Sequence, residues 1–172
     1  MDRETLRGRQ RPLKQLYREQ PGAGIITLRA SGAVGGDGVS CSVQTGQALV
    51  AAGLHPATGG DGTLACSGDL LLQALVACAG VTLAAVATNR GLAVAGTIRA
   101  EGELDVRGTL GLDPEVPVGF RSIRLAFELD TDADPQAVEG LIATTEKYCV
   151  VLQTLRSALH VETVLERSAA GS

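Results

Sequence analysis

The residues of this chain best suited to chemistry are its four cysteines, Cys41, Cys66, Cys78 and Cys149. Their spacings of 25, 12 and 71 residues do not include the close cysteine pairs of a structural zinc site, and the two histidines are distant from them in sequence. We therefore expect neither a metal nor a cofactor. A disulfide framework is not expected in a reducing compartment, so the thiols either pack as small apolar side chains or form a redox pair.

Cys78 lies near the middle of "GDLLLQALVACAGVTLAAVATNRG" (68–91), a run in which residues 70–87 carry no charge. An apolar pocket raises the pKa of a thiol, and the helix N-terminus is several turns away from Cys78. A reactive Cys78 therefore needs a cation from elsewhere in the fold, most simply an arginine. His55, in the glycine-rich loop "GLHPATGGDG" (53–62), could fold over the site, although a loop histidine is more often simply exposed.

Cys149 follows "TTEKY" (144–148), which includes Glu146. It is 71 residues from Cys78, so only the fold could bring the two sulfurs together. Two adjacent thiols suit peroxide reduction, because the attacked thiolate becomes a sulfenic acid and the second thiol condenses with it to a disulfide. We expect Cys41 and Cys66 to be packing residues.

Composition limits the classes of function. The chain has 172 residues, of which 45% are hydrophobic and 20% charged, with a net charge of −4, so we expect one soluble domain and no nucleic-acid partner. The expected organisation is a charged N-terminal arm (1–20), one domain (21–168) and a short tail (169–172). The arm has no apolar run typical of a secretory signal, and we expect a cytoplasmic protein.

The uncharged run is long enough to cross a membrane. Its many Ala and Gly residues, the interruptions at Gln73 and Thr82, and the lack of a second candidate span favour a buried core helix instead. We expect no membrane partner. Ser67 is the expected N-cap of this helix, Asp69 lies in its first turn, and Gly91 ends it.

The other elements follow from periodicity and turn residues. A hairpin is expected over 24–34 and 38–46, one or two strands over 92–108, and a half-buried strand over 120–130. A helix capped by Asp134 and begun by Pro135 covers 132–147, a second helical stretch covers 148–159, and a strand covers 160–166. Residues 13–19 are either a short helix or an extension toward a partner subunit. This order predicts an α+β fold with antiparallel strands around the long helix.

The pairing of "LLLQALVACAGVTL" with "TTEKYCVVLQTL" downstream resembles the OsmC/Ohr family of osmotically induced and organic hydroperoxide resistance proteins, over residues 24–166. The resemblance implies an OsmC-like fold, an intertwined homodimer with sites at the interface, and a peroxidase that reduces organic hydroperoxides with an external dithiol reductant in oxidative stress defence. It implies that Cys78 is the peroxidatic cysteine and Cys149 the resolving one.

Three positions differ from the family pattern and point to a divergent branch. The acid that holds the family's arginine against the sulfur corresponds most closely to Asp69. Many members carry that arginine just after a Gly-Gly in the hairpin, but here Gly35-Gly36 is followed by Asp37, and the nearest basic candidate is Arg29. Val150 follows Cys149 where many relatives have proline. Two other functions remain open: a small-molecule binding or redox-sensing homodimer that lacks catalysis, and a purely structural dimer.

Overall fold

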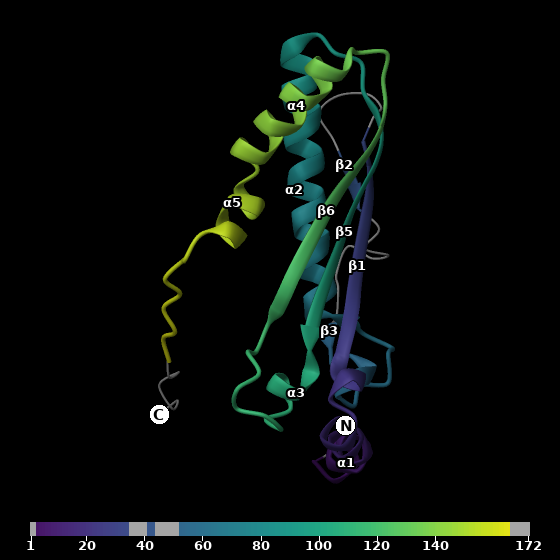
Figure 1. Ribbon diagram of the computed structural model, residues 1–172, viewed down its shortest axis with the longest axis vertical. Coiled ribbons are helices and arrows are strands. Elements are labelled where there is room, and N and C mark those ends of the chain that lie inside the picture. The colour runs from purple at the N-terminus through teal and green to yellow at the C-terminus, as the bar shows by residue number, and fades with distance from the viewer. Residues whose placement is uncertain (1–2, 35–40, 44–51, 166–172) are drawn as a thin grey trace, which may run out of the picture.

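The computed structural model describes residues 3–34, 41–43 and 52–165 (Figure 1). Its helices are α1 (Arg3–Glu19), α2 (Ser67–Arg90), α3 (Val106–Thr109), α4 (Pro135–Tyr148) and α5 (Val150–Arg156), with two 3₁₀ helices, η1 (Pro21–Gly24) and η2 (Pro56–Thr58). Its strands are β1 (Ile25–Val34), β2 (Cys41–Val43), β3 (Ala52–Gly53), β4 (Ala65–Cys66), β5 (Ala95–Asp105) and β6 (Phe120–Asp130).

Four strands form one antiparallel sheet in the order β2-β1-β5-β6. In β1 and β5, Ala30 lies opposite Ala100, and in β5 and β6, Ile98 lies opposite Phe127. The short strands β3 and β4 form a separate parallel pair. The expected hairpin is confirmed by the β1–β2 pairing, the expected strand over 120–130 is β6, and the α+β class is confirmed.

The helix α2 packs against the sheet through β1 and β5, and α4 and α5 pack against α2 (Figure 1). Its fully buried side chains Leu72, Leu75 and Val76 join Ile98 of β5 in the core. Within the described residues the four-stranded sheet thus packs on one side of α2, and the expected placement of strands around the helix stays a prediction. One face of an antiparallel sheet can remain in solvent, which permits this one-sided arrangement.

The length and apolar composition of α2 would also allow it to cross a membrane. The helix begins one residue earlier than its expected cap implies: Cys66 occupies the N-cap position, and Ser67 is the first helical residue. The reason is that Cys66 ends strand β4, where it pairs with Gly53. The C-terminal end is as expected, because Gly91 has a φ of 68° and closes the helix in the left-handed region.

The C-terminal region has two helices separated by a break. Asp134 caps α4 as expected, its carboxylate accepting a hydrogen bond from the Ala137 N–H at 2.9 Å. The expected second helix is shorter than its sequence pattern: α5 begins at Val150, and Cys149 lies between the two helices with φ −70° and ψ 104°. The break places Cys149 at the junction between α4 and α5.

One expectation about the ends of the chain is wrong. Residues 160–165 form no strand, because none of the described strands lies beside them, and this segment runs away from the sheet (Figure 1). For residues 13–19 the helical alternative is confirmed, since they belong to the longer helix α1, which is attached by Tyr17, whose hydroxyl donates to the Ala57 carbonyl at 2.7 Å. Residues 166–172 lie outside the described residues.

Candidate active site

Cys78 and Cys149 lie together where α2 meets the junction between α4 and α5. Cys78 is half-buried in the middle of α2, and Cys149 is fully buried at the junction. Both are free thiols, and their side chains are hydrogen-bonded to each other. The fold therefore brings together the two cysteines that the sequence singled out.

The Cys78 thiol is surrounded by hydrogen-bond donors. Burial raises its pKa, but hydrogen bonds led by those from the Val151 backbone, the Cys149 side chain and the Val150 backbone outweigh burial, so the pKa lies below its ordinary value. The Thr82 hydroxyl donates its proton to the Cys78 carbonyl, at 2.7 Å. A thiolate at Cys78 is thus stabilised chiefly by backbone N–H groups.

The pKa of Cys149 moves in the opposite direction. Burial raises it first, and the neighbouring Cys78 raises it further, to about 11. Of the two sulfurs, Cys78 is therefore the one that ionises and Cys149 the one that stays protonated and donates. This asymmetry gives the pair one nucleophile and one proton-bearing partner.

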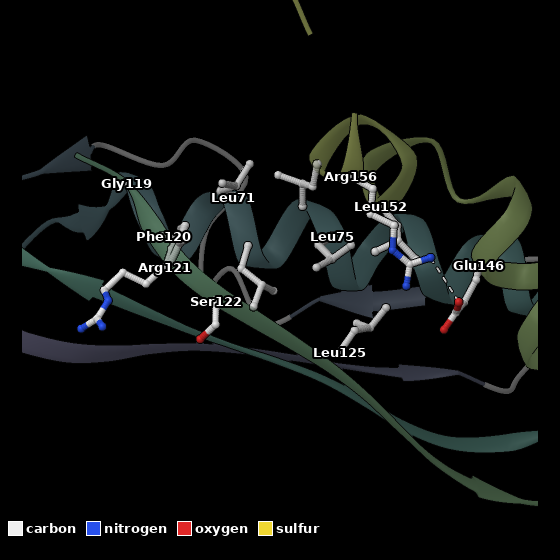
Figure 2. A pocket seen from close by; sticks show the side chains of 12 residues that line it. Leu71, Leu75, Gly119, Phe120, Arg121, Ser122, Leu125, Glu146, Leu152 and Arg156 are labelled. Atoms are coloured by element: carbon white, nitrogen blue, oxygen red, sulfur yellow. Dashed lines mark hydrogen bonds and ion pairs between the residues drawn. The ribbon is translucent and has the colours of Figure 1, made fainter. Parts of the chain in front are cut away.

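An apolar groove of about 580 Å³ lies between α2, α5 and β6, and neither Cys78 nor Cys149 is among the residues that line it. Leu75 precedes Cys78 by one helical turn, and Leu152 follows Cys149 by one turn; both line the groove. Figure 2 shows these two side chains together with Leu71, Phe120 and Leu125 around the same space. The groove could hold an apolar molecule against Leu75 and Leu152, each of which is one helical turn from a cysteine in the sequence.

Charged residues stand at the edges of this groove. Glu146, near the end of α4, pairs with Arg156 of α5 at 3.2 Å (Figure 2). Arg121 also lines the groove. Glu146 was a candidate supporting residue, and the structure places it at the helix junction, three residues before Cys149.

The remaining candidates are not placed at the sulfurs. Asp69 lies in the first turn of α2, nine residues before Cys78 and about 13 Å along the helix axis. Arg29 lies in β1 opposite Glu101, and its side chain is outside the described residues. The contact of an acid and an arginine with the thiol therefore stays a prediction.

His55 has a local structural role. Its Nδ1 accepts a hydrogen bond from the Ala57 N–H at 3.0 Å and caps η2, which packs chiefly against α1 and α3. Cys66 is half-buried at the start of α2 and packs against the core. Cys41 lies in β2, and its side chain is outside the described residues. His55 is thus not brought over the thiols.

The sequence reading missed the donors that lower the pKa of Cys78. The signal that could have found them is Val150, which stands where proline is common in the family. Proline has no N–H, whereas the Val150 N–H bonds the Cys78 thiol. The break in the helix at Cys149, which directs this N–H group to the sulfur, was hidden in an otherwise helical pattern.

A family model for OsmC-like proteins matches residues 60–164, which is more than half of the chain and includes both cysteines. This chain belongs to the OsmC-like family. Its fold is similar to the crystal structure of an OsmC-like hydroperoxide resistance protein from Jannaschia sp. CCS1, with a TM-score of 0.56 and 17% sequence identity over 86% of this chain and 97% of that one. No curated protein matches the chain.

At this identity the likeness to the Jannaschia protein concerns the fold alone. The matched region of the OsmC-like family model includes α2, the sheet strands β5 and β6, and both helices of the C-terminal junction. The helix junction that bears Cys149 is therefore part of the family domain, while α1 lies outside the matched residues.

Proposed function

We propose that this protein is a thiol-dependent peroxidase that reduces organic hydroperoxides in oxidative stress defence, in a reducing compartment such as the cytoplasm. The observation that carries the proposal is the hydrogen-bonded pair of Cys78 and Cys149, whose pKa values move in opposite directions. Membership of the OsmC-like family and the fold of a hydroperoxide resistance protein support peroxide chemistry.

In the proposed reaction the Cys78 thiolate attacks the distal oxygen of the hydroperoxide. A sulfur–oxygen bond forms, the peroxide bond breaks, and an alkoxide leaves while Cys78 becomes a sulfenic acid. The Cys149 thiol, with a pKa of about 11, is protonated at neutral pH and gives its proton to the alkoxide, which departs as the alcohol.

The second step uses the thiolate that this transfer leaves at Cys149. It attacks the Cys78 sulfur, hydroxide leaves and takes a proton from solvent to become water, and a disulfide forms. Two electrons from an external dithiol then reduce the disulfide and restore both thiols. Because the sulfurs are hydrogen-bonded before reaction, the resolving step needs little rearrangement.

The apolar groove supports an organic substrate over hydrogen peroxide. Its Leu, Ile and Phe side chains offer an alkyl or aralkyl group a surface away from water, and two of them, Leu75 and Leu152, are one helical turn from Cys78 and Cys149 in the sequence. Hydrogen peroxide has no group that such a surface would retain. We therefore expect alkyl hydroperoxides to oxidise Cys78 faster than hydrogen peroxide does.

A homodimer is the second part of the proposal. The described end of the chain exposes four large apolar side chains, Leu159, Val161, Val164 and Leu165, with exposed fractions of 62%, 75%, 67% and 79%. Several large apolar side chains exposed within seven residues are typical of an interface. Light scattering should give a dimer, and Val161→Asp combined with Leu165→Asp should weaken it; a monomeric parent protein would contradict this part.

The catalytic test follows consumption of cumene hydroperoxide with dithiothreitol as the reductant. Cys78→Ser should abolish turnover, and Cys149→Ser should allow one oxidation of Cys78 followed by over-oxidation to the sulfinic acid. Cys66→Ser is the matched control, because this thiol lies outside the pair, and it should retain activity. Undiminished turnover by Cys78→Ser would sink the proposal.

The same assay separates a peroxidase from the non-catalytic alternative. A redox sensor would form the Cys78–Cys149 disulfide with hydroperoxide, but the disulfide would resist reduction by dithiols and turnover would stop after one equivalent. A binding module would leave both thiols reduced. Mass spectrometry of the peptides that contain the two cysteines distinguishes these outcomes.

A further inference from the structure

The break between α4 and α5 changes the partners of two backbone N–H groups. In a continuous helix the Val150 N–H would bond the Glu146 carbonyl, and the Val151 N–H would bond the carbonyl four residues before it. Cys149 has ψ 104°, outside the helical region, although its own N–H still bonds the Thr145 carbonyl at 2.8 Å. The Val150 and Val151 N–H groups bond the Cys78 thiol instead.

This change leaves the Glu146 carbonyl without its helical donor. The side chain of Gln153 takes that place, with its Nε2 donating to the Glu146 carbonyl at 2.7 Å. The backbone N–H of Gln153 meanwhile bonds the Cys149 carbonyl at 2.9 Å. Gln153 therefore holds both sides of the break, one through its side chain and one through its backbone.

A second contact crosses the same break. The Arg156 guanidinium pairs with the Glu146 carboxylate at 3.2 Å, but both side chains are about half-exposed, so solvent screens the pair. The amide bond from Gln153 is shorter and is aimed at the carbonyl that the break exposes. Gln153 is thus the better candidate for the residue that fixes the junction.

We propose that Gln153 is a positioning residue for Cys78: its side-chain amide replaces the Val150 N–H at the Glu146 carbonyl and thereby keeps the Val150 and Val151 N–H groups directed at the Cys78 sulfur. The inference deepens the proposed peroxidase function and rests on it for its catalytic meaning. Cys149 is the titratable side chain that bonds Cys78. Of the charged groups at the junction, Glu146 of α4 and Arg156 of α5 are paired with each other, and the ammonium of Lys147, in the last turn of α4, lies 5.3 Å from the centroid of the Tyr148 ring.

The test uses three variants of the full chain. Gln153→Met keeps the length of the side chain but removes the donor, and Gln153→Lys keeps a donor at similar reach. Gln136→Met is the matched control, because Gln136 is an exposed glutamine in the first turn of α4, away from the junction. Iodoacetamide alkylation of Cys78 is followed as a function of pH by mass spectrometry of its peptide.

Gln153→Met should alkylate severalfold more slowly at pH 7 than the parent, and its pH profile should move upward, because the thiolate loses aligned donors. Gln153→Lys and Gln136→Met should follow the parent profile. A Gln153→Met profile that superimposes on the parent, or an equal shift in Gln136→Met, would overturn the inference. Circular dichroism shows whether Gln153→Met folds. If it does not, the Gln153→Lys variant is the test, because an altered pH profile of Cys78 alkylation in that variant would also overturn the positioning role of Gln153.

Turnover of cumene hydroperoxide by the parent protein, measured alongside, separates the two proposals. A parent without turnover but with the expected shift in Gln153→Met would refute the peroxidase function and leave the positioning role intact. A parent with turnover and no shift in Gln153→Met would refute the positioning role alone.

Discussion

The side chains of Cys78 and Cys149 are hydrogen-bonded although 71 residues separate them in the sequence. Cys78 comes from the middle of α2, and Cys149 from the break between α4 and α5. The partnership is unequal, because the pKa of Cys78 is lowered and that of Cys149 is raised. Cys78 is the sulfur that ionises because it accepts hydrogen bonds from the Val150 and Val151 N–H groups, which follow the break.

The first prediction concerns the pH dependence of the unmodified protein. Because hydrogen bonds lower the pKa of Cys78, its alkylation rate should reach a plateau at a pH below that of an ordinary thiol. Cys149 should react appreciably only as the pH approaches about 11. Alkylation of the two peptides, quantified separately from pH 5 to 11, measures both, and a reversed order of reactivity would contradict the assignment of roles.

The second prediction isolates one backbone donor. Val150→Pro removes an N–H that bonds Cys78, while the first position of a helix tolerates proline and the extended ψ of Cys149 suits a following proline. The variant should fold normally, and its Cys78 should alkylate about fivefold more slowly at pH 7, since a hydrogen bond to a charged group is lost.

Val150→Ala is the control for this experiment. It removes the same exposed side chain and keeps the N–H, so Cys78 should react as in the parent. Equal slowing in the alanine and proline variants would show that the side chain, and not the N–H, matters. Unfolding by urea should confirm that the two variants have similar stability.

Much of the fold could be predicted from local pattern. The alternation in 120–130 gave β6, the uncharged run gave α2, and the Asp134-Pro135 pair marked the start of α4. These signals are local, because periodicity and capping residues act over a few positions. The expected strand over 160–166 failed for the opposite reason, since a strand also needs a neighbour that the segment itself does not encode.

The candidate site divides in the same way. Cys78 and Cys149 were identified from their context, and within residues 3–34, 41–43 and 52–165, where the side chain of Arg29 is not described, the groups that lower the pKa of Cys78 include no cation. Two of its donors are backbone N–H groups, which every residue except proline carries and which a sequence does not mark. The backbone break at Cys149 gives these two groups their direction, and α5, which carries them, is in contact with α2.

The third prediction tests whether the apolar groove binds the substrate, by displacing Phe120, one of the residues that line it. A Cβ added at Gly102 of β5 would lie 2.4 Å from Cε1 of Phe120, so Gly102→Ala must displace this ring, which lines the groove. We expect a loss of about 1 to 3 kcal/mol in the free energy of unfolding from overpacking. Oxidation of Cys78 by cumene hydroperoxide should slow more than oxidation by hydrogen peroxide, because only the former uses the groove.

Gly22→Ala is the matched control for the groove variant, because no atom lies within 4 Å of a Cβ added there. It should leave both oxidation rates and the unfolding free energy unchanged. If Gly102→Ala slows the two peroxides equally, the groove does not hold the substrate. Stopped-flow measurement of Cys78 oxidation supplies the rates.

The last prediction concerns a charged cluster at the end of β5, away from the thiols. Asp105, with a side chain only 2% exposed, accepts hydrogen bonds from the Arg107 guanidinium at 2.6 and 3.0 Å, and these bonds hold the pKa of Asp105 below its usual range. The pair therefore stabilises the fold fully at pH values above about 4, the ordinary pKa of a carboxyl group. This contribution to the free energy of unfolding is lost as the pH falls through the lower pKa that Asp105 has in the folded protein. Asp105→Asn should lower the free energy of unfolding at pH 7, since it removes the buried carboxylate that accepts these bonds, and should make stability less sensitive to acid. Urea unfolding from pH 7 to pH 2.5 measures both effects, with Asp132→Asn, an exposed carboxylate, as the control; parallel curves for Asp105→Asn and the parent would refute the assignment.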